Sequence, residues 1–348
     1  METATLGKGK LFGPASFYKK ALLIALPVML QMLIQNMVSL IDNFMVSGLG
    51  DVKMSGVNIS GQILFVFMVL LNTICTAGGI FMSQYYGAGD KRGMRQALSF
   101  KAVLAAAAIV LYLLVCMVFP RQILSLMVVG NSQADAILDE AVKYMFLMGF
   151  NGIPMAISTI CSSSLREIGR VRTPLYISVI ATLVNTFFNW VLIYGNLGAP
   201  RLEVQGAAIA TLFSRIVSAV VLVICLRHPG RRIVVDHYAR IRPDSARIRR
   251  ILKMGVPNGV EQGMFQFGKL AIQSSVSMMG TLAIAAQGMT SVMEALLSRA
   301  SEGVALGLMT IVGQCLGAGL KDEARKNVIR MSGWAEIAML VSCAIMAA

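Results

Sequence analysis

A single carboxylate, Asp42, lies near the end of the first long apolar segment of this chain. An ionisable group in membrane hydrocarbon costs about 2.5–3.5 kcal/mol on insertion scales, so a residue of this kind is a candidate for function. Loss of water favours the neutral form of a carboxyl group, which suits Asp42 to take up and release a proton. A structural role, in which Asp42 only hydrogen-bonds a neighbouring helix, remains open.

Uncharged polar residues in other apolar segments are suited to accompany this carboxylate. Asn185 and Asn189 are four residues apart and share one helix face, from which their amides can reach Asp42 or the ligand shell of a cation. Thr211 is a fourth candidate, although a hydroxyl on a membrane helix often bonds its own backbone. Arg215 and Lys269 have no obvious partner on their own helices, so we expect both to contact other helices.

Acidic residues also occur in later apolar segments. Glu261 is suited to contact a positively charged ligand, or it is neutralised by Lys269 or Arg250. Glu302 lies three residues after Arg299 on the same predicted helix, so the two either form a buried ion pair or contact a ligand. Both alternatives place these residues inside the membrane.

The composition shows which kind of element holds these residues. Apolar residues make up 56% of the chain and charged residues 14%, and the mean hydropathy is +0.71, which is outside the range of soluble domains. Several apolar runs reach the ~20 residues that a membrane-spanning helix requires. Nine spans are predicted, at roughly 17–47, 57–84, 97–119, 136–163, 173–195, 204–226, 250–279, 284–314 and 327–348.

The net charge of +14 is distributed unevenly among the connections. Lys and Arg concentrate in the N-terminal segment and in the second, fourth and sixth connections, and the stretch from Arg227 to Lys253 is the richest in arginine. This alternation follows the positive-inside rule and predicts a cytoplasmic N-terminus. Topology thus explains the basic residues, so we expect the lipid bilayer as a partner and no nucleic acid.

The chain repeats itself with an offset of 230 residues. The segment from Gln84 to Gly89 returns from Gln314 to Gly319, and further identities join Pro27 to Pro257, Gly50 to Gly280, Lys91 to Lys321 and Arg95 to Arg325. A parallel repeat of this length in an apolar chain is typical of a two-lobed transporter whose site lies between the lobes.

The second copy is shorter than the first. We expect an N-terminal tail (1–16), a six-helix N-lobe (17–228), a basic connection (229–249) and a partial C-lobe of three helices (250–348). Counterparts of the fourth, fifth and sixth helices of the first copy are missing from it. The chain is therefore expected to be a C-terminally truncated form of a larger architecture.

Motifs for nucleotides, metals and catalysis are rejected. Gly263 to Lys269 has P-loop spacing, but it lies in an apolar helix and Leu270 stands where a Ser or Thr is needed. The two Gly-Ala-Gly turns follow helices rather than strands, so they are not dinucleotide fingerprints. The six cysteines contain no CxxC pair, and no nucleophile with a base is visible. We expect no cofactor, no resident metal and no enzymatic activity.

Several segments resemble the multidrug and toxic compound extrusion (MATE) family over nearly the whole chain. They are the stretch from Leu26 to Gly50, the two Gln-x-x-Gly-Ala-Gly turns, the helix of Asn185 and Asn189 ending in Leu192-Ile193-Tyr194-Gly195, and the segment from Gly206 to Thr211. The resemblance implies an all-α integral membrane fold with twelve helices in two six-helix lobes, of which this chain would hold about nine. It also implies export of organic cations in exchange for H⁺ or Na⁺ by rocking between inward-open and outward-open states.

The resemblance also bears on the site residues. Family members often carry an acid where this chain has Asn189, which leaves the coupling ion open between H⁺ and Na⁺, including Na⁺ near Asp42. In the sodium-coupled branch another acid falls where this chain has Phe265 and Gln266, so no sodium site is carried over there, and Gln266 stays only a candidate contact in the C-lobe.

The expected protein is thus a plasma-membrane antiporter for small organic cations. It is expected to be monomeric, or to pair with a complementing C-terminal piece. The alternatives are a remnant that does not transport and a flippase for lipid-linked precursors. A flippase should have a more basic interior, whereas the core helices of the first lobe hold few basic residues apart from Lys143 and Arg215.

Overall fold

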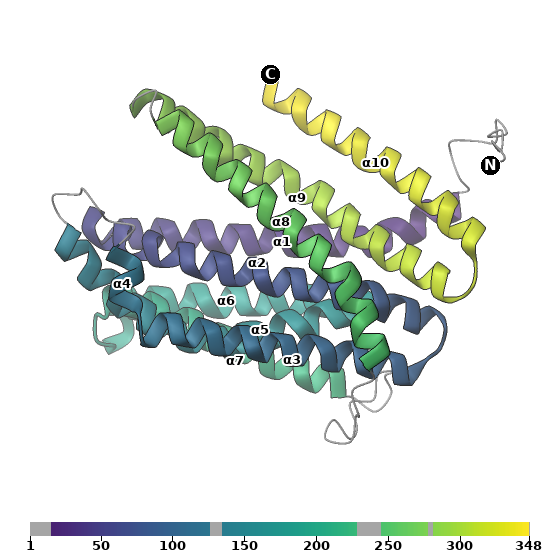
Figure 1. Ribbon diagram of the computed structural model, residues 1–348. Coiled ribbons are helices and arrows are strands. Elements are labelled where there is room, and N and C mark those ends of the chain that lie inside the picture. Colours follow the sequence, from purple (N-terminus) through teal and green to yellow (C-terminus); the bar gives the residue numbers. More distant parts are fainter. Residues whose placement is uncertain (1–14, 126–133, 228–244, 278–280, 348) are drawn as a thin grey trace.

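The computed structural model describes residues 15–125, 134–227, 245–277 and 281–347, and over these residues the chain is helical without strands (Figure 1). Within these ranges nine helices are long, and a six-residue helix and a short 3₁₀ turn are also present. In chain order the helices are α1 (Ala15–Ser47), α2 (Asp51–Gly87), α3 (Lys91–Met117), α4 (Pro120–Ser125), α5 (Ala134–Glu167), α6 (Arg172–Tyr194), η1 (Asn196–Gly198), α7 (Glu203–Arg227), α8 (Ser245–Ser277), α9 (Thr281–Gly317) and α10 (Lys321–Ala347).

Each of the nine predicted spans coincides with one long helix. Most helices extend a few residues beyond the predicted spans, because hydrocarbon thickness limits the apolar stretch but not the helix that contains it. The sequence did not predict α4 or η1, which lie in connections. The predicted tail and basic connection fall mainly on residues 1–14 and 228–244, outside the described residues.

Among the described residues, six helices are long and apolar enough to cross a membrane, namely α1, α2, α3, α5, α6 and α7. We call these helices, together with α4, the N-lobe, and α8 to α10 the C-lobe. In the C-lobe α8 begins with an arginine-rich turn and carries Glu261 and Lys269, and Ser301–Gly317 of α9 forms an apolar stretch. Charge lowers the hydropathy of α8, which is as long as the helices of the N-lobe.

The N-lobe is organised around α5, which is the most buried of its spans and packs against α2, α3 and α7. Small residues let these backbones approach. A Cβ on Gly56 of α2 would lie 3.0 Å from the Ala141 backbone nitrogen of α5, and Ser60 donates to the Ala141 carbonyl oxygen at 2.9 Å. Such contacts replace the hydrophobic driving force that is absent between helices in lipid.

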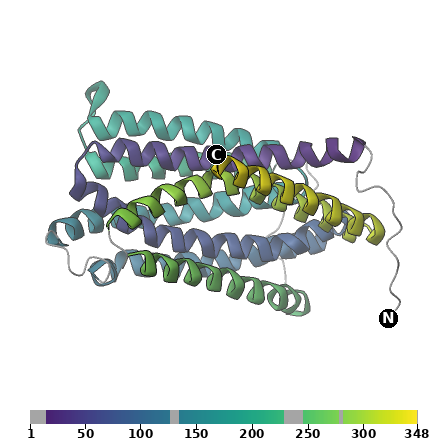
Figure 2. The same cartoon turned by 90° about the horizontal axis from the view of Figure 1, so that it is seen from above.

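The C-lobe contacts the N-lobe mainly through α9, which packs against α1 and α2, and through α8, which packs against α2. We call the end of the molecule that carries residues 88–90 and 318–320 the closed end, and the end that carries residues 48–50 the open end. From the closed end, α8 and α9 diverge from the N-lobe toward the open end (Figure 1), and α9 lies between α1 and α8 when viewed from above (Figure 2).

Both Gly-Ala-Gly segments are helix-ending turns, as predicted. Ala88 and Ala318 each donate a backbone hydrogen bond to the glutamine four residues earlier, and Gly89 and Gly319 have φ of 71° and 79°. These left-handed conformations end a helix at little cost only for a residue without a Cβ. The P-loop-like segment from Gly263 to Lys269 lies inside α8, which confirms that it is helical.

Candidate functional site

The structure brings four predicted residues of the N-lobe into one hydrogen-bonded chain. The Asn189 Nδ2 atom donates to Asp42 Oδ1 at 2.5 Å and to Asn185 Oδ1 at 3.2 Å, and Asn185 Nδ2 donates to Thr211 Oγ1 at 3.3 Å. The predicted proximity of the two amides to Asp42 is therefore confirmed. Thr211 joins the same chain through its hydroxyl oxygen. We refer to these four residues as the Asp42 network.

Three helices supply this network, and identifiable contacts hold them together. Gly206 lets α7 approach α6, because a Cβ there would lie 2.6 Å from the Leu192 carbonyl oxygen. The Tyr194 hydroxyl donates to the Met45 carbonyl oxygen at 3.1 Å, which ties the end of α6 to α1 one turn beyond Asp42. The spacing of Asn185 and Asn189 then directs both amides to one side of α6.

Burial and charge distinguish the network from an ordinary polar contact. Asn189 is completely buried, and among the described residues its Oδ1 atom has no hydrogen-bond partner. Arg215, one turn after Thr211 on α7, exerts its positive charge on the Asp42 carboxylate. The predicted contact of Arg215 with another helix stays a prediction. The network combines a carboxylate, a free amide oxygen and a nearby guanidinium, which is a suitable arrangement for binding a small cation reversibly.

The three C-lobe candidates lie outside this network. Glu261 is exposed on α8, and neither predicted neutralising partner is paired with it. Lys269 instead pairs with Glu294 at 3.4 Å, and the Arg250 guanidinium lies 6.0 Å from the centroid of the Phe81 ring. The alternative in which Lys269 or Arg250 neutralises Glu261 is therefore wrong, whereas the expected contact of Lys269 with another helix is confirmed.

Gln266 and Glu302 occupy different surroundings. Gln266 is half-buried on α8, and Glu302 is exposed on α9. The side chain of Arg299 lies outside the described residues, so the pairing predicted between Arg299 and Glu302 stays a prediction. Both candidate residues belong to the C-lobe helices that pack on α1 and α2.

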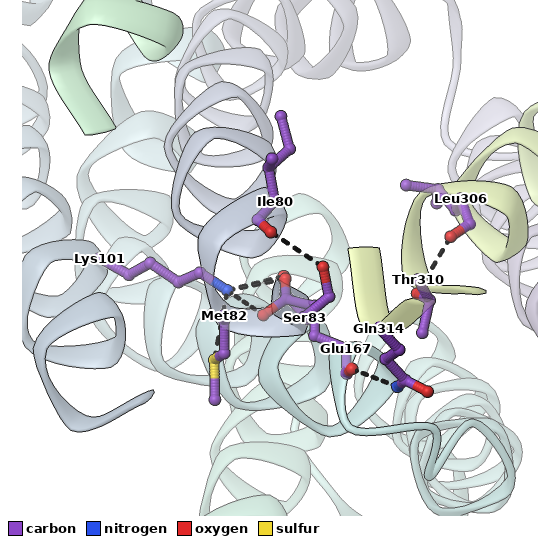
Figure 3. A network of polar contacts seen from close by, with 9 residues as sticks. Ile80, Met82, Ser83, Lys101, Glu167, Leu306, Thr310 and Gln314 are labelled. Carbon is purple, nitrogen blue, oxygen red and sulfur yellow. Dashed lines mark hydrogen bonds and ion pairs between the residues drawn. The ribbon is translucent and has the colours of Figure 1, made fainter. Parts of the chain in front are cut away.

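Sequence reasoning missed a buried ion pair in the N-lobe. Lys101 of α3 is fully buried, and its Nζ atom lies 2.5 Å and 2.7 Å from the two carboxylate oxygens of Glu167, the last residue of α5 (Figure 3). The Ser163 hydroxyl donates to the same carboxylate at 2.6 Å. The predicted span ended at residue 163, so Glu167 was assigned to a connection. The spacing of Ser163 and Glu167 on one helix face was the available signal.

The prediction for Lys143 is wrong. The sequence placed this lysine among the few basic residues of the N-lobe core, whereas its exposed side chain pairs with Glu140 at 2.8 Å one turn earlier on α5. Lys101, rather than Lys143, is the lysine of the N-lobe interior.

Known proteins are similar to this chain in sequence and in fold. A probable multidrug resistance protein NorM from Thermotoga maritima is 26% identical over 316 residues, which is 91% of this chain and 66% of that protein. The FAD transporter of Shewanella oneidensis is 25% identical over 303 residues, 84% of this chain and 63% of that protein. The chain spans about two thirds of the length of the curated relatives that it matches.

Solved structures of other proteins match the fold of this chain. The outward-facing conformation of a multidrug resistance MATE family transporter of the MOP superfamily matches with a TM-score of 0.84 at 18% identity, over 94% of this chain and 71% of that chain. A crystal structure of MATE in the bent conformation matches with a TM-score of 0.83 at 18% identity, over 94% and 71%. Residues 27–191 match the MatE family model, so the chain carries a MatE domain and is similar in sequence and fold to MATE transporters.

Proposed function

We propose that the protein is a secondary antiporter that exports small organic molecules in exchange for a cation, with Asp42 as the residue that binds the coupling cation. Its MatE domain and its similarity to MATE transporters support this proposal, and the Asp42 network is the observation that carries it. Asp42 lies in a membrane-spanning helix, and a buried amide beside it has an oxygen without a partner in the described part of the chain.

The charges around the network provide a basis for exchange. An ionised Asp42 attracts a cation and offsets the positive charge of Arg215. Binding of H⁺ or Na⁺ at Asp42 removes that negative charge and leaves Arg215 uncompensated, which disfavours a second cation nearby. A coupling ion and a cationic cargo would then compete through a single carboxylate, and such negative coupling between two ligands is the thermodynamic requirement of antiport.

The arrangement of the lobes supports alternating access. The described lobe contacts gather toward the closed end, whereas Asp42 lies near the open end of α1. The charge pattern of the connections supports a cytoplasmic closed end, and by analogy an open end at the outer face of a plasma membrane. This orientation supports the interpretation of the arrangement as an outward-open state from which a cargo can leave.

Organic cations are the first cargo class to test, because the coupling residue is an acid. The relative named as an FAD transporter supplies a second class, an anionic dinucleotide. The Arg215 guanidinium near the network is the observation in this chain that favours testing an anion. Transport of either class would be driven by the same ion gradient.

The test is dye transport by the purified chain in proteoliposomes. Ethidium and FAD are supplied separately, and an imposed pH gradient and a Na⁺ gradient are compared. We expect gradient-driven transport that Asp42→Asn abolishes, because the variant binds no cation through a carboxylate. The matched control is Asp139→Asn, which changes an exposed acid of α5 that pairs with Arg121 and should leave transport unchanged.

Transport that persists in Asp42→Asn would remove Asp42 from the coupling mechanism. Absence of transport under every gradient, with a folded protein, would instead support the alternative of a chain that does not transport.

A further inference from the structure

The two lobes meet at the closed end through a pair of reciprocal glycine contacts. A Cβ on Gly87 of α2 would lie 2.8 Å from the carbonyl carbon and 2.9 Å from the Cα of Gln314 in α9. A Cβ on Gly317 of α9 would lie 2.7 Å and 2.9 Å from the same two atoms of Gln84 in α2. These four residues are related by the 230-residue repeat, so the crossing of α2 and α9 is symmetric at the level of the backbone. Close crossings of this kind are typical of membrane helices with small residues at their interface.

The side chains at the crossing are not symmetric. Gln314 Nε2 donates to the backbone carbonyl oxygen of Glu167 at 2.8 Å, which joins α9 of the C-lobe to the end of α5 in the N-lobe. The Gln84 side chain forms no hydrogen bond with any residue that the structure describes. A symmetric crossing therefore carries a hydrogen bond from only one of its two glutamines.

The end of α5 explains why this carbonyl is available. Gly169 has a φ of 81° and closes α5 with two backbone hydrogen bonds, from Gly169 to the Arg166 carbonyl and from Arg170 to the Leu165 carbonyl. This Schellman pattern satisfies the two preceding carbonyls and leaves that of Glu167 without an intrahelical partner. Gln314 supplies the missing donor.

The buried ion pair fixes the position of the same residue. Lys101 and Ser163 hold the Glu167 carboxylate, and Gly78 and Gly79 of α2 leave the space that the two long side chains occupy. A Cβ on Gly78 would lie 2.6 Å from the Lys101 Cγ, and one on Gly79 would lie 2.9 Å from the Glu167 carboxyl carbon. The side chain of Glu167 is thus held within the N-lobe, while its backbone carbonyl oxygen accepts the hydrogen bond from Gln314 of the C-lobe (Figure 3).

We propose that Gln314 is a positioning residue for alternating access: its hydrogen bond to Glu167 latches the closed end, and the Lys101–Glu167 pair holds the acceptor in place. The latch rests on the proposed transport function for its purpose, since a lobe contact that must break in each cycle sets the ratio of the two access states. Its existence is testable without transport.

The experiment measures the separation of the closed ends of the lobes. Spin labels are placed on Lys91→Cys and Lys321→Cys, which are repeat-related, exposed, and the first residues of α3 and α10, in a background lacking the native cysteines. Double electron–electron resonance spectroscopy of the full chain in nanodiscs then gives the fractions of molecules with a short and with a long distance between the two labels. Gln314→Met removes the donor and retains the length of the side chain, and Gln84→Met is the matched control at the equivalent position.

We expect Gln314→Met to raise the ratio of long to short distances roughly fivefold, which corresponds to the loss of one neutral hydrogen bond. Gln84→Met should change the ratio less than twofold. An unchanged ratio in Gln314→Met, or equal changes in both variants, would overturn the latch. If Gln314→Met does not fold, Gln314→Ala and Gln84→Ala replace the two variants under the same criteria.

The distances also separate this inference from the proposed function. If the distances change as expected but no transport is measured, only the transport proposal is refuted. If the protein transports but Gln314→Met leaves the distances unchanged, only the latch is refuted.

Discussion

The buried Lys101–Glu167 pair makes a quantitative prediction about folding stability. The two side chains are 0% and 2% exposed and are joined by two short contacts, so removing one partner leaves an uncompensated charge in the interior. Breaking a buried pair in this way costs about 3–5 kcal/mol, whereas replacing both partners by neutral residues of similar shape is often close to neutral. We therefore expect Lys101→Met to destabilise the protein by about 3–5 kcal/mol and Lys101→Met with Glu167→Gln to recover most of that loss.

A double-mutant cycle measures the coupling between the two residues. Unfolding in mixed micelles of increasing dodecyl sulfate content is followed by tryptophan fluorescence for the parent, the two single variants and the double variant. The exposed pair Lys143–Glu140 supplies the matched control, since it joins the same two residue types at 2.8 Å on the surface of the N-lobe. Its cycle should give about 0.5 kcal/mol or less, because solvent screens exposed ion pairs.

Equal coupling energies for the buried and exposed pairs would refute this reasoning. A Lys101→Met variant as stable as the parent would do the same, since it would show that the Glu167 carboxylate does not need its partner. Coupling of at least about 2 kcal/mol for the buried pair would support it.

Further substitutions test individual contacts. Gly87→Ala should widen the lobe crossing and raise the fraction of molecules with a long distance between the spin labels at the closed end. Gly61→Ala, on the same helix with open space around it, should instead stabilise the fold by up to about 1 kcal/mol. Equal effects of the two substitutions would contradict the close contact at Gly87. Lys269→Met should change the free energy of unfolding by less than about 0.5 kcal/mol, because its bond to Glu294 is exposed, and a larger loss would show that the pair is shielded from solvent. Ser60→Ala should cost about 0.6–1.7 kcal/mol in the same unfolding assay by removing a buried bond between α2 and α5, and no loss would mean that the bond does not contribute.

The long helices were predictable because apolar length is a strong signal and the repeat constrains both copies. The proximity of Asn185 and Asn189 to Asp42 was predictable too, since helix periodicity fixes a shared face and a buried acid requires partners. Thr211 illustrates the limit of that reasoning. Its position on the next helix was clear, but only the packing of α7 on α6 decides whether its hydroxyl oxygen accepts from Asn185.

The Lys101–Glu167 pair was not predictable in the same way. Its members are 66 residues apart and come from different helices, and Glu167 lies where the apolar run has already ended. Lys269 was expected to contact another helix, and its partner, Glu294, does lie on α9, but the sequence did not identify which residue that partner is. Long-range ion pairs depend on tertiary packing, which hydrophobic periodicity does not encode.

The crossing at the closed end restricts which substitutions this chain tolerates. Every amino-acid replacement reached by one base change in a glycine codon adds at least a Cβ, and at Gly87 that atom meets the main chain of Gln314. A main-chain atom is present whatever residue occupies position 314, so no second substitution there makes room. Gly87 and Gly317 should therefore remain glycine in homologous sequences without compensation, whereas Lys101 and Glu167, which meet through side chains, are free to be replaced together.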